Sequence, residues 1–202
     1  MDKIYDLDGL IARVEECGIL RFWTESDLSV WTLSGIGFNA MWDLREKAVN
    51  SKRVAYGKFV QKKATFVSLD LLPYLCAMRR DGYDFDSLSD EGLVPNRETL
   101  IMNAVGTEQV PSYALGQSLG IKGFDTAVTS LQNKTYLCLQ FKKSAMGTAL
   151  LCRPEDVFGY DFVRSKYNLS PAECAEHIKT RAAKGLAPFS DKDRQKILSP
   201  AI

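Results

Sequence analysis

The sequence predicts an α+β fold that is mostly helical and contains a winged helix-turn-helix. Three features of residues 97–153 support this fold. Apolar residues recur at helical spacing in three successive segments, glycines separate the second segment from the third, and two strand-like segments follow. We expect an N-terminal α/β segment with a hairpin before this unit and a C-terminal helical tail after it.

The first two predicted helices are short and amphipathic. The apolar stripe of the first consists of Leu100, Ile101, Ala104 and Val105. The second helix is expected to begin at Pro111-Ser112, a favourable pair for a helix start, and to end at Gly120. Leu115 and Leu119 lie on one side of it, so both helices present one apolar face to a common core.

The third predicted helix has one apolar and one polar face. Its apolar face consists of Phe124, Ala127, Val128 and Leu131, at positions i, i+3, i+4 and i+7. The opposite face is small, polar and almost uncharged, and in a DNA-binding unit it would enter the major groove. The candidate DNA-contacting residues at this helix are Thr126, Thr129, Ser130, Asn133 and Lys134.

A hairpin with a basic loop is expected after the third helix. Residues 135–141 alternate as in a half-buried strand, with Leu137, Leu139 and Phe141 on one side, and residues 148–153 form the partner strand. The loop between them begins with Lys142 and Lys143 and ends with a glycine. Such a wing would place both lysines beside the phosphate backbone.

We divide the chain into three regions. Residues 1–92 form an N-terminal helical and hairpin region, for which a second, degenerate winged helix is one interpretation. Residues 93–159 hold the winged helix-turn-helix. Residues 160–202 form a C-terminal helix, starting at Ser170-Pro171, and a tail from Lys184 that is either partly ordered or docked.

Within the N-terminal region the pattern predicts a helix that ends before Gly18 and a strand at 30–33. A hairpin is expected from strands 54–60 and 64–67, joined by Gln61-Lys62-Lys63. Ser68 is expected to cap a further helix that stops near Arg79-Arg80-Asp81-Gly82. Residues 81–95, which are rich in Asp, Ser, Gly and Glu, are expected to form a solvated connector.

Composition limits the possible partners. The 202 residues carry a net charge of +1, so no overall positive field attracts nucleic acid, and any DNA binding must come from local patches. Five scattered cysteines without a CxxC pair suggest neither a disulfide framework nor a zinc site. No apolar run is long enough to span a membrane and no signal peptide is seen, so we expect a cytoplasmic protein.

Three other motifs fail as sites, so we expect no catalytic residue, metal or cofactor. Residues 35–40 match G-x-G-x-x-G/A, but no carboxylate follows at the spacing that a dinucleotide ribose needs. The acidic cluster between Asp81 and Glu91 lacks the spacing of a calcium loop. His177, the sole histidine, has no nearby nucleophile in a recognisable motif.

Five blocks of sequence, in order along the chain, resemble the AlkZ-related family of bacterial winged-helix proteins, which are relatives of the AlkZ-type DNA glycosylases. These blocks are Tyr56-Gly57-Lys58-Phe59, Lys63-Ala64-Thr65-Phe66-Val67-Ser68, Arg79-Arg80-Asp81-Gly82-Tyr83-Asp84-Phe85-Asp86, Leu131-Gln132-Asn133-Lys134-Thr135-Tyr136-Leu137 and Pro154-Glu155-Asp156-Val157-Phe158-Gly159. The resemblance implies a winged-helix architecture, DNA as the partner and a link to DNA repair. It does not carry the enzyme activity over, because the Gln-x-Gln or Gln-x-Asp motif of those glycosylases is absent; Gln132-Asn133-Lys134 comes nearest.

Three functions stay open on the sequence. The first is a DNA-binding module, which gains support if Lys62-Lys63, Arg79-Arg80 and Lys142-Lys143 gather on the face that shows Thr129 and loses most of its support if they scatter. The second is a glycosylase-like enzyme with a pocket lined by aromatic residues such as Trp23, Trp31 and Trp42. The third is a winged-helix module that binds another protein, which the near-neutral charge favours.

Overall fold

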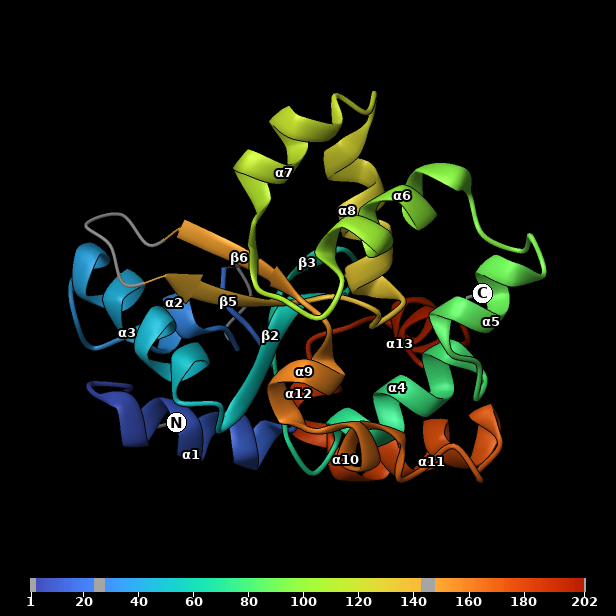
Figure 1. Ribbon diagram of the computed structural model, residues 1–202. Coiled ribbons are helices and arrows are strands. Elements are labelled where there is room, and N and C mark those ends of the chain that lie inside the picture. The colour runs from blue at the N-terminus through green and yellow to red at the C-terminus, as the bar shows by residue number, and fades with distance from the viewer. Residues whose placement is uncertain (1–2, 24–27, 143–147, 202) are drawn as a thin grey trace.

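The computed structural model describes residues 3–23, 28–142 and 148–201. Residues 7–68 form an N-terminal unit of three helices and a three-stranded antiparallel sheet in the order β1-β3-β2 (Figure 1). Its elements are α1 (Leu7–Cys17), β1 (Ile19–Arg21), α2 (Val30–Leu33), α3 (Phe38–Asn50), β2 (Val54–Val60) and β3 (Lys63–Ser68).

Residues 96–152 form a central unit with the same succession of elements. They are α6 (Asn96–Val105), β4 (Val110–Pro111), α7 (Ser112–Leu119), α8 (Phe124–Asn133), β5 (Cys138–Lys142) and β6 (Thr148–Cys152). The sheet order β4-β6-β5 also repeats that of the N-terminal unit, in which the first strand pairs with the third. The predicted α+β class is confirmed, and the chain contains one topology twice.

The remaining helices connect the two units and complete the fold. They are α4 (Leu72–Arg80), α5 (Phe85–Asp90), α9 (Pro154–Phe158), α10 (Tyr160–Arg164), α11 (Pro171–Arg181), α12 (Ala183–Leu186) and α13 (Asp191–Ile197). We call residues 154–197 the C-terminal helices. Helix α4 packs against α10 and α11 at the base of the molecule (Figure 1).

Local sequence explains where several helices begin and end. The Asp6 side chain accepts a hydrogen bond from the Gly9 amide at 2.8 Å and so caps α1. Ser170 and Glu173 form a reciprocal capping box at the start of α11. Gly120 ends α7 in the left-handed conformation, as predicted.

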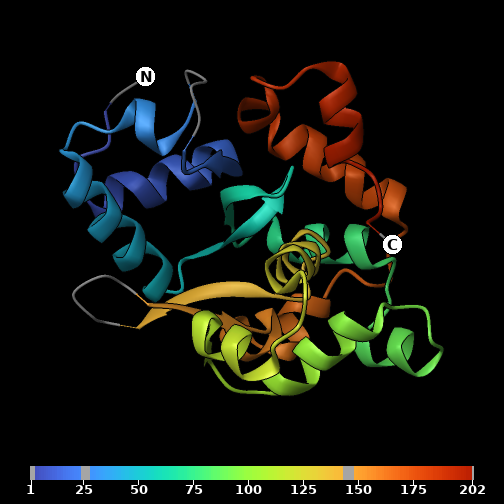
Figure 2. The same cartoon turned by 90° about the horizontal axis from the view of Figure 1, so that it is seen from above.

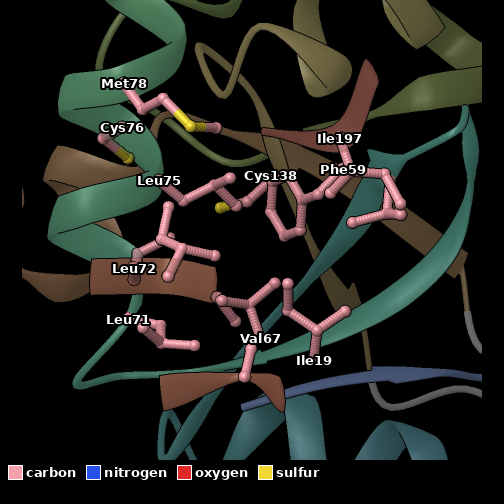
Figure 3. Close-up of a cluster of buried hydrophobic side chains, with 14 of the residues drawn as sticks. Ile19, Phe59, Val67, Leu71, Leu72, Leu75, Cys76, Met78, Cys138 and Ile197 are labelled. Atoms are coloured by element: carbon pink, nitrogen blue, oxygen red, sulfur yellow. The ribbon is translucent and has the colours of Figure 1, made fainter. Parts of the chain in front are cut away.

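One apolar cluster draws on most of the chain (Figure 3). Leu72 and Leu75 of α4 meet Val67 and Phe59 of the N-terminal sheet, and Cys138 of β5 joins them. Residues of the C-terminal helices, such as Ile178 and Leu186, belong to the same cluster. The segment after Lys184 is therefore docked on the core through α12 and α13 rather than projecting as a tail.

The hairpin β5–β6 lies between the N-terminal unit and the helices of the central unit (Figure 2). Asn50 of α3 holds its edge, because its side chain donates to the Phe141 carbonyl at 2.9 Å and accepts from the Phe141 amide at 3.0 Å. Gln140 is buried and Phe141 packs into the core of the N-terminal unit. The predicted strand and its partner are confirmed as β5 and β6, but the prediction that only one face of this strand is buried is wrong, since β5 is covered on both faces.

Four other local predictions are wrong for related reasons. Leu100 is 45% exposed and Ala104 is exposed, because α6 turns Ile101, Met102 and Val105 toward α8 instead. Residues 30–33 form helix α2, which a Ser29–Thr32 capping box starts, and not a strand. Ser68 ends β3 and does not cap α4, which starts at Leu72 without a side-chain cap.

The fourth wrong prediction concerns residues 81–95. Much of this segment is exposed, but it includes helix α5, whose Phe85 and Leu88 side chains are buried in the core of the central unit. The two apolar residues are separated by three positions, which is one helical turn. The acidic residues around Phe85 and Leu88 make the segment resemble a solvated loop, so the helical spacing of these two apolar residues was not recognised.

Candidate nucleic-acid interface

The predicted DNA-contacting face of α8 lies partly against strand β2 of the N-terminal unit. The Lys58 ammonium donates to Thr129 Oγ1 at 3.1 Å, and the Lys58 amide donates to Gln132 Oε1 at 2.8 Å. Asn133 Nδ2 donates to the Phe59 carbonyl at 2.8 Å. The C-terminal half of this face thus joins the two units, and a DNA contact by Thr129 or Asn133 would have to break these bonds.

The other candidate residues lie apart from this contact. Lys134 pairs with the buried Glu98 carboxylate at 3.2 Å, which ties α8 to α6. Thr126 is exposed and Ser130 is half-buried. Lys142 is exposed at the end of β5, whereas Lys143 lies outside the described residues. Their contacts with DNA stay a prediction.

Of the three basic pairs, Arg79-Arg80 cannot supply a phosphate contact. Arg79 donates to the Ile197 carbonyl at 2.8 Å, and burial lowers the pKa of its guanidinium to about 10. Arg80 is 1% exposed. The three basic pairs therefore do not all gather on one face, because both guanidinium groups of this pair point into the protein, and the DNA-binding interpretation loses this support. Lys62 and Lys63 are exposed at the β2–β3 turn.

Arg80 instead holds four segments together. Its Nη1 atom donates to Tyr167 Oη at 2.8 Å and to the Glu155 carboxylate, and its Nε atom donates to Thr135 Oγ1 at 3.1 Å. A further bond reaches the Thr135 carbonyl. Burial alone would lower the pKa of Arg80, but ionisable neighbours that include Glu155 raise it, so the group stays charged.

An aromatic pocket of about 400 Å³ opens between the N-terminal unit and the hairpin β5–β6. Helix α3, strand β2 and the residues after β1 form one side, and the hairpin forms the other. The residues that line it are Phe22, Trp23, Phe38, Trp42, Arg45, Tyr56, Gly57, Lys58, Ala64, Leu139, Phe141 and Ala149. We call this cavity the aromatic pocket.

The Arg45 guanidinium is the central polar group of this pocket. Its carbon atom lies 4.2 Å from the centre of the Phe141 ring and 4.3 Å from that of Trp42, so it stacks against both rings. Glu46 contacts it at 3.3 Å. Arg45 Nε and Trp42 Nε1 are buried donors that find no hydrogen-bond acceptor in the described part of the chain.

The pocket is suited to a flat, electron-rich ligand. Trp23, Phe38 and Trp42 offer ring surface, because Phe22, Tyr56 and Phe141 are buried, and Arg45 and Lys58 supply positive charge. Among the described lining residues none is a carboxylate, glutamine or histidine. The Arg45 Nε and Trp42 Nε1 atoms are themselves covered by protein, so the polar group that the pocket offers to a ligand is positive charge and not these two donors.

Sequence reasoning found only part of this pocket. It named Trp23 and Trp42 as pocket residues, and the structure brings both to the lining, whereas Trp31 lies next to it and stacks on Trp23. Arg45 was missed. The helical spacing of Phe38, Trp42 and Arg45, at i, i+4 and i+7, was the available signal.

The five cysteines are all buried, and burial raises the pKa of each thiol, to about 11 for Cys76 and about 12 for Cys152. Since the thiolate is the reactive form, we expect a thiol reagent to label none of them in the folded protein at about pH 8. Denaturation should expose all five. A cysteine that reacts quickly before denaturation would contradict this burial.

Two other candidate sites gain no support. His177 is exposed and stacks on Tyr74 with 3.7 Å between ring centres. Within residues 3–23, 28–142 and 148–201, no group of three or more histidine, cysteine or carboxylate side chains could hold a metal ion. None of the helices described there has the length and apolar character to cross a membrane.

Comparison with known proteins identifies the family. The sequence model of the AlkZ-related family matches residues 4–199, which is nearly the whole chain. No curated protein and no solved structure matches the chain. The match agrees with the resemblance carried by the five sequence blocks, and because it covers both units and the C-terminal helices, this chain belongs to the AlkZ-related family.

Proposed function

We propose that this chain is a DNA-binding protein built from two winged-helix units and that it acts in connection with DNA repair. The repeated succession of elements, with the first strand paired to the third in each sheet, is the order that a winged helix requires. Membership of the AlkZ-related family supports the link to repair. The shape alone does not define the ligand.

The aromatic pocket is the observation that carries the proposal. It lies where the two units meet, and its aromatic rings and its two cations, Arg45 and Lys58, fit an unstacked nucleobase next to a phosphate.

The geometry also assigns a larger role to α3 than the sequence suggested. Helix α3 occupies the same position in the N-terminal unit as α8 in the central unit. Its first turn presents the exposed Phe38 and Asn39 beside the aromatic pocket, whereas the polar face of α8 is partly engaged with β2. We therefore propose that DNA lies across the first turn of α3, the exposed Thr126 of α8 and the hairpin.

The wing lysines provide the first test. Replacing Lys142 and Lys143 by alanine should weaken binding of duplex DNA about equally across sequences and lower the slope of log affinity against log salt by about two. Fluorescence anisotropy with a labelled duplex at several salt concentrations measures both. The matched control replaces Lys192 and Lys196, two exposed lysines of α13, and should leave the slope unchanged.

The result separates the three functions. A slope that is unchanged in the wing variant removes the wing from the interface. Absence of binding to any duplex at low salt overturns the DNA-binding proposal and favours a module that binds another protein. Abasic sites formed in alkylated duplex DNA would favour the glycosylase, although the described lining of the pocket contains no carboxylate or glutamine to position a water.

A further inference from the structure

The N-terminal unit carries an exposed aromatic stack beside the aromatic pocket. The indole rings of Trp23 and Trp31 stack with 4.2 Å between their centres and 24° between their planes. Phe38 meets both rings edge-on, at 5.8 Å and 6.0 Å. These three side chains are 45%, 40% and 51% exposed, and we call them the aromatic platform.

The backbone fixes the platform in place. The Trp31 amide donates to the Phe22 carbonyl at 3.1 Å, which holds α2 against the end of β1. The Ser29–Thr32 capping box starts α2 one residue before Trp31, and Gly37 starts α3 one residue before Phe38. Tyr5 packs directly on Gly35 between them, where a Cβ atom would lie 2.7 Å from Tyr5 Cδ1.

Platform and pocket form one continuous surface. Trp23 and Phe38 belong to both, and the Phe38 ring leads to Trp42 at 5.9 Å. Cations flank this surface: Lys3 donates to the Thr32 carbonyl next to Trp31, at 2.9 Å, while Arg45 and Lys58 line the pocket. Exposed rings in a row with cations on both sides suit a strand whose bases are free to stack.

We propose that the aromatic platform stacks the bases of an unpaired stretch of DNA and passes one base to the aromatic pocket. This inference rests on the proposed DNA binding and adds a substrate class, namely DNA that contains a gap, bubble or flap. In an intact duplex the faces of the bases are covered by their neighbours, so a duplex offers nothing for three exposed rings to stack on. Exposed rings of this kind are otherwise costly to solubility.

The protein contains its own probe for this surface. All three tryptophans of the chain, Trp23, Trp31 and Trp42, lie in the platform or the pocket. Titration with an oligothymidylate of about 12 nucleotides should therefore quench the intrinsic tryptophan fluorescence, because stacked bases quench indole emission. A blunt duplex with the same number of phosphates should bind with little quenching.

The Trp31→Ala variant tests the platform. Anisotropy should show an affinity for the oligothymidylate that is about 5- to 150-fold lower, while the affinity for the duplex changes by less than about 2-fold. Trp31→Phe keeps a ring and should retain most of the affinity. The matched control is Tyr160→Ala, which removes a ring that is 55% exposed on α10, and should change neither affinity. Thermal unfolding confirms that the variants fold.

The outcomes distinguish the two proposals. Three results would overturn the platform and leave DNA binding intact. They are equal affinity for the duplex and the single strand, no tryptophan quenching by the oligothymidylate, or an equal loss of affinity for both ligands in Trp31→Ala. Absence of binding to both oligonucleotides overturns the proposed function as well. Quenching by the oligothymidylate that Trp31→Ala abolishes supports both.

Discussion

Replacing Arg80 by methionine is expected to destabilise the folded chain by about 3–5 kcal/mol, the cost of breaking a buried and fully bonded ion pair. Methionine fills a similar volume, so the loss reports the missing charge and hydrogen bonds rather than a cavity. Arg80 links α4 to Thr135, to Glu155 of α9 and to Tyr167, and its partners would be left unsatisfied. Urea unfolding followed by circular dichroism measures the change.

Two further variants check the cause of this loss. Arg80→Lys should not restore stability, because an ammonium cannot reach the Thr135, Glu155 and Tyr167 acceptors at once. Arg53→Met removes an exposed pair with Asp8 and should cost less than about 1 kcal/mol. If the free energy of unfolding of the Arg80→Met protein lay within about 1 kcal/mol of the wild-type value, the hydrogen bonds of Arg80 would not be important for the stability of the fold.

The second large effect is expected at Gly185 in α12. A Cβ atom there would lie 2.6 Å from the Cys17 carbonyl oxygen and would also collide with that of Ile19. Both are backbone atoms, which cannot move aside as a side chain can. Gly185→Ala should therefore cost about 1–3 kcal/mol, with a lower denaturation midpoint.

The matched control for this substitution is Gly37→Ala. No atom lies within 4 Å of a Cβ built at Gly37, so alanine there should cost less than about 1 kcal/mol. Equal stability of the two variants would mean that the C-terminal helices do not pack against the N-terminal unit as closely as the structure shows. Such a result would indicate that the residues after Lys184 form a loosely attached tail.

The sequence predicted the elements whose apolar residues repeat within one segment. Helices α1, α7 and α8 and the hairpin β2–β3 all lie where periodicity and glycine placed them. Local pattern is sufficient there because each element turns a single face to the core. The buried face of α6 was predicted wrongly at Leu100. This helix has two adjacent apolar faces, and tertiary packing buries the one that contains Ile101, Met102 and Val105.

The contacts between units could not be predicted from local pattern. Lys58 and Thr129 lie 71 residues apart, and nothing near either one indicates that the polar face of α8 packs on β2. The same holds for Phe141, which completes the pocket around Arg45. The predicted polar face of α8 is polar, but Thr129, Gln132 and Asn133 on it form hydrogen bonds with strand β2 of the same chain.

Arg79 and Arg80 illustrate the limit of interpreting charge without tertiary structure. A pair of arginines is usually solvated, and this pair was grouped with the basic turns. The residues before it, Leu71 to Met78, are apolar on nearly every side, which is the pattern of a helix buried all round. That pattern was the available signal that both arginines would need partners inside the protein.

The central claim is that nucleic acid contacts this chain at the aromatic pocket and the aromatic platform. Photocrosslinking to gapped DNA that carries 5-iodouracil in the unpaired stretch, followed by mass spectrometry of the crosslinked peptides, locates the contact directly. Crosslinks to Trp23, Trp31 or Phe38 are expected, and they should be lost when unlabelled single strand is added in excess. Crosslinks confined to the C-terminal helices would contradict it.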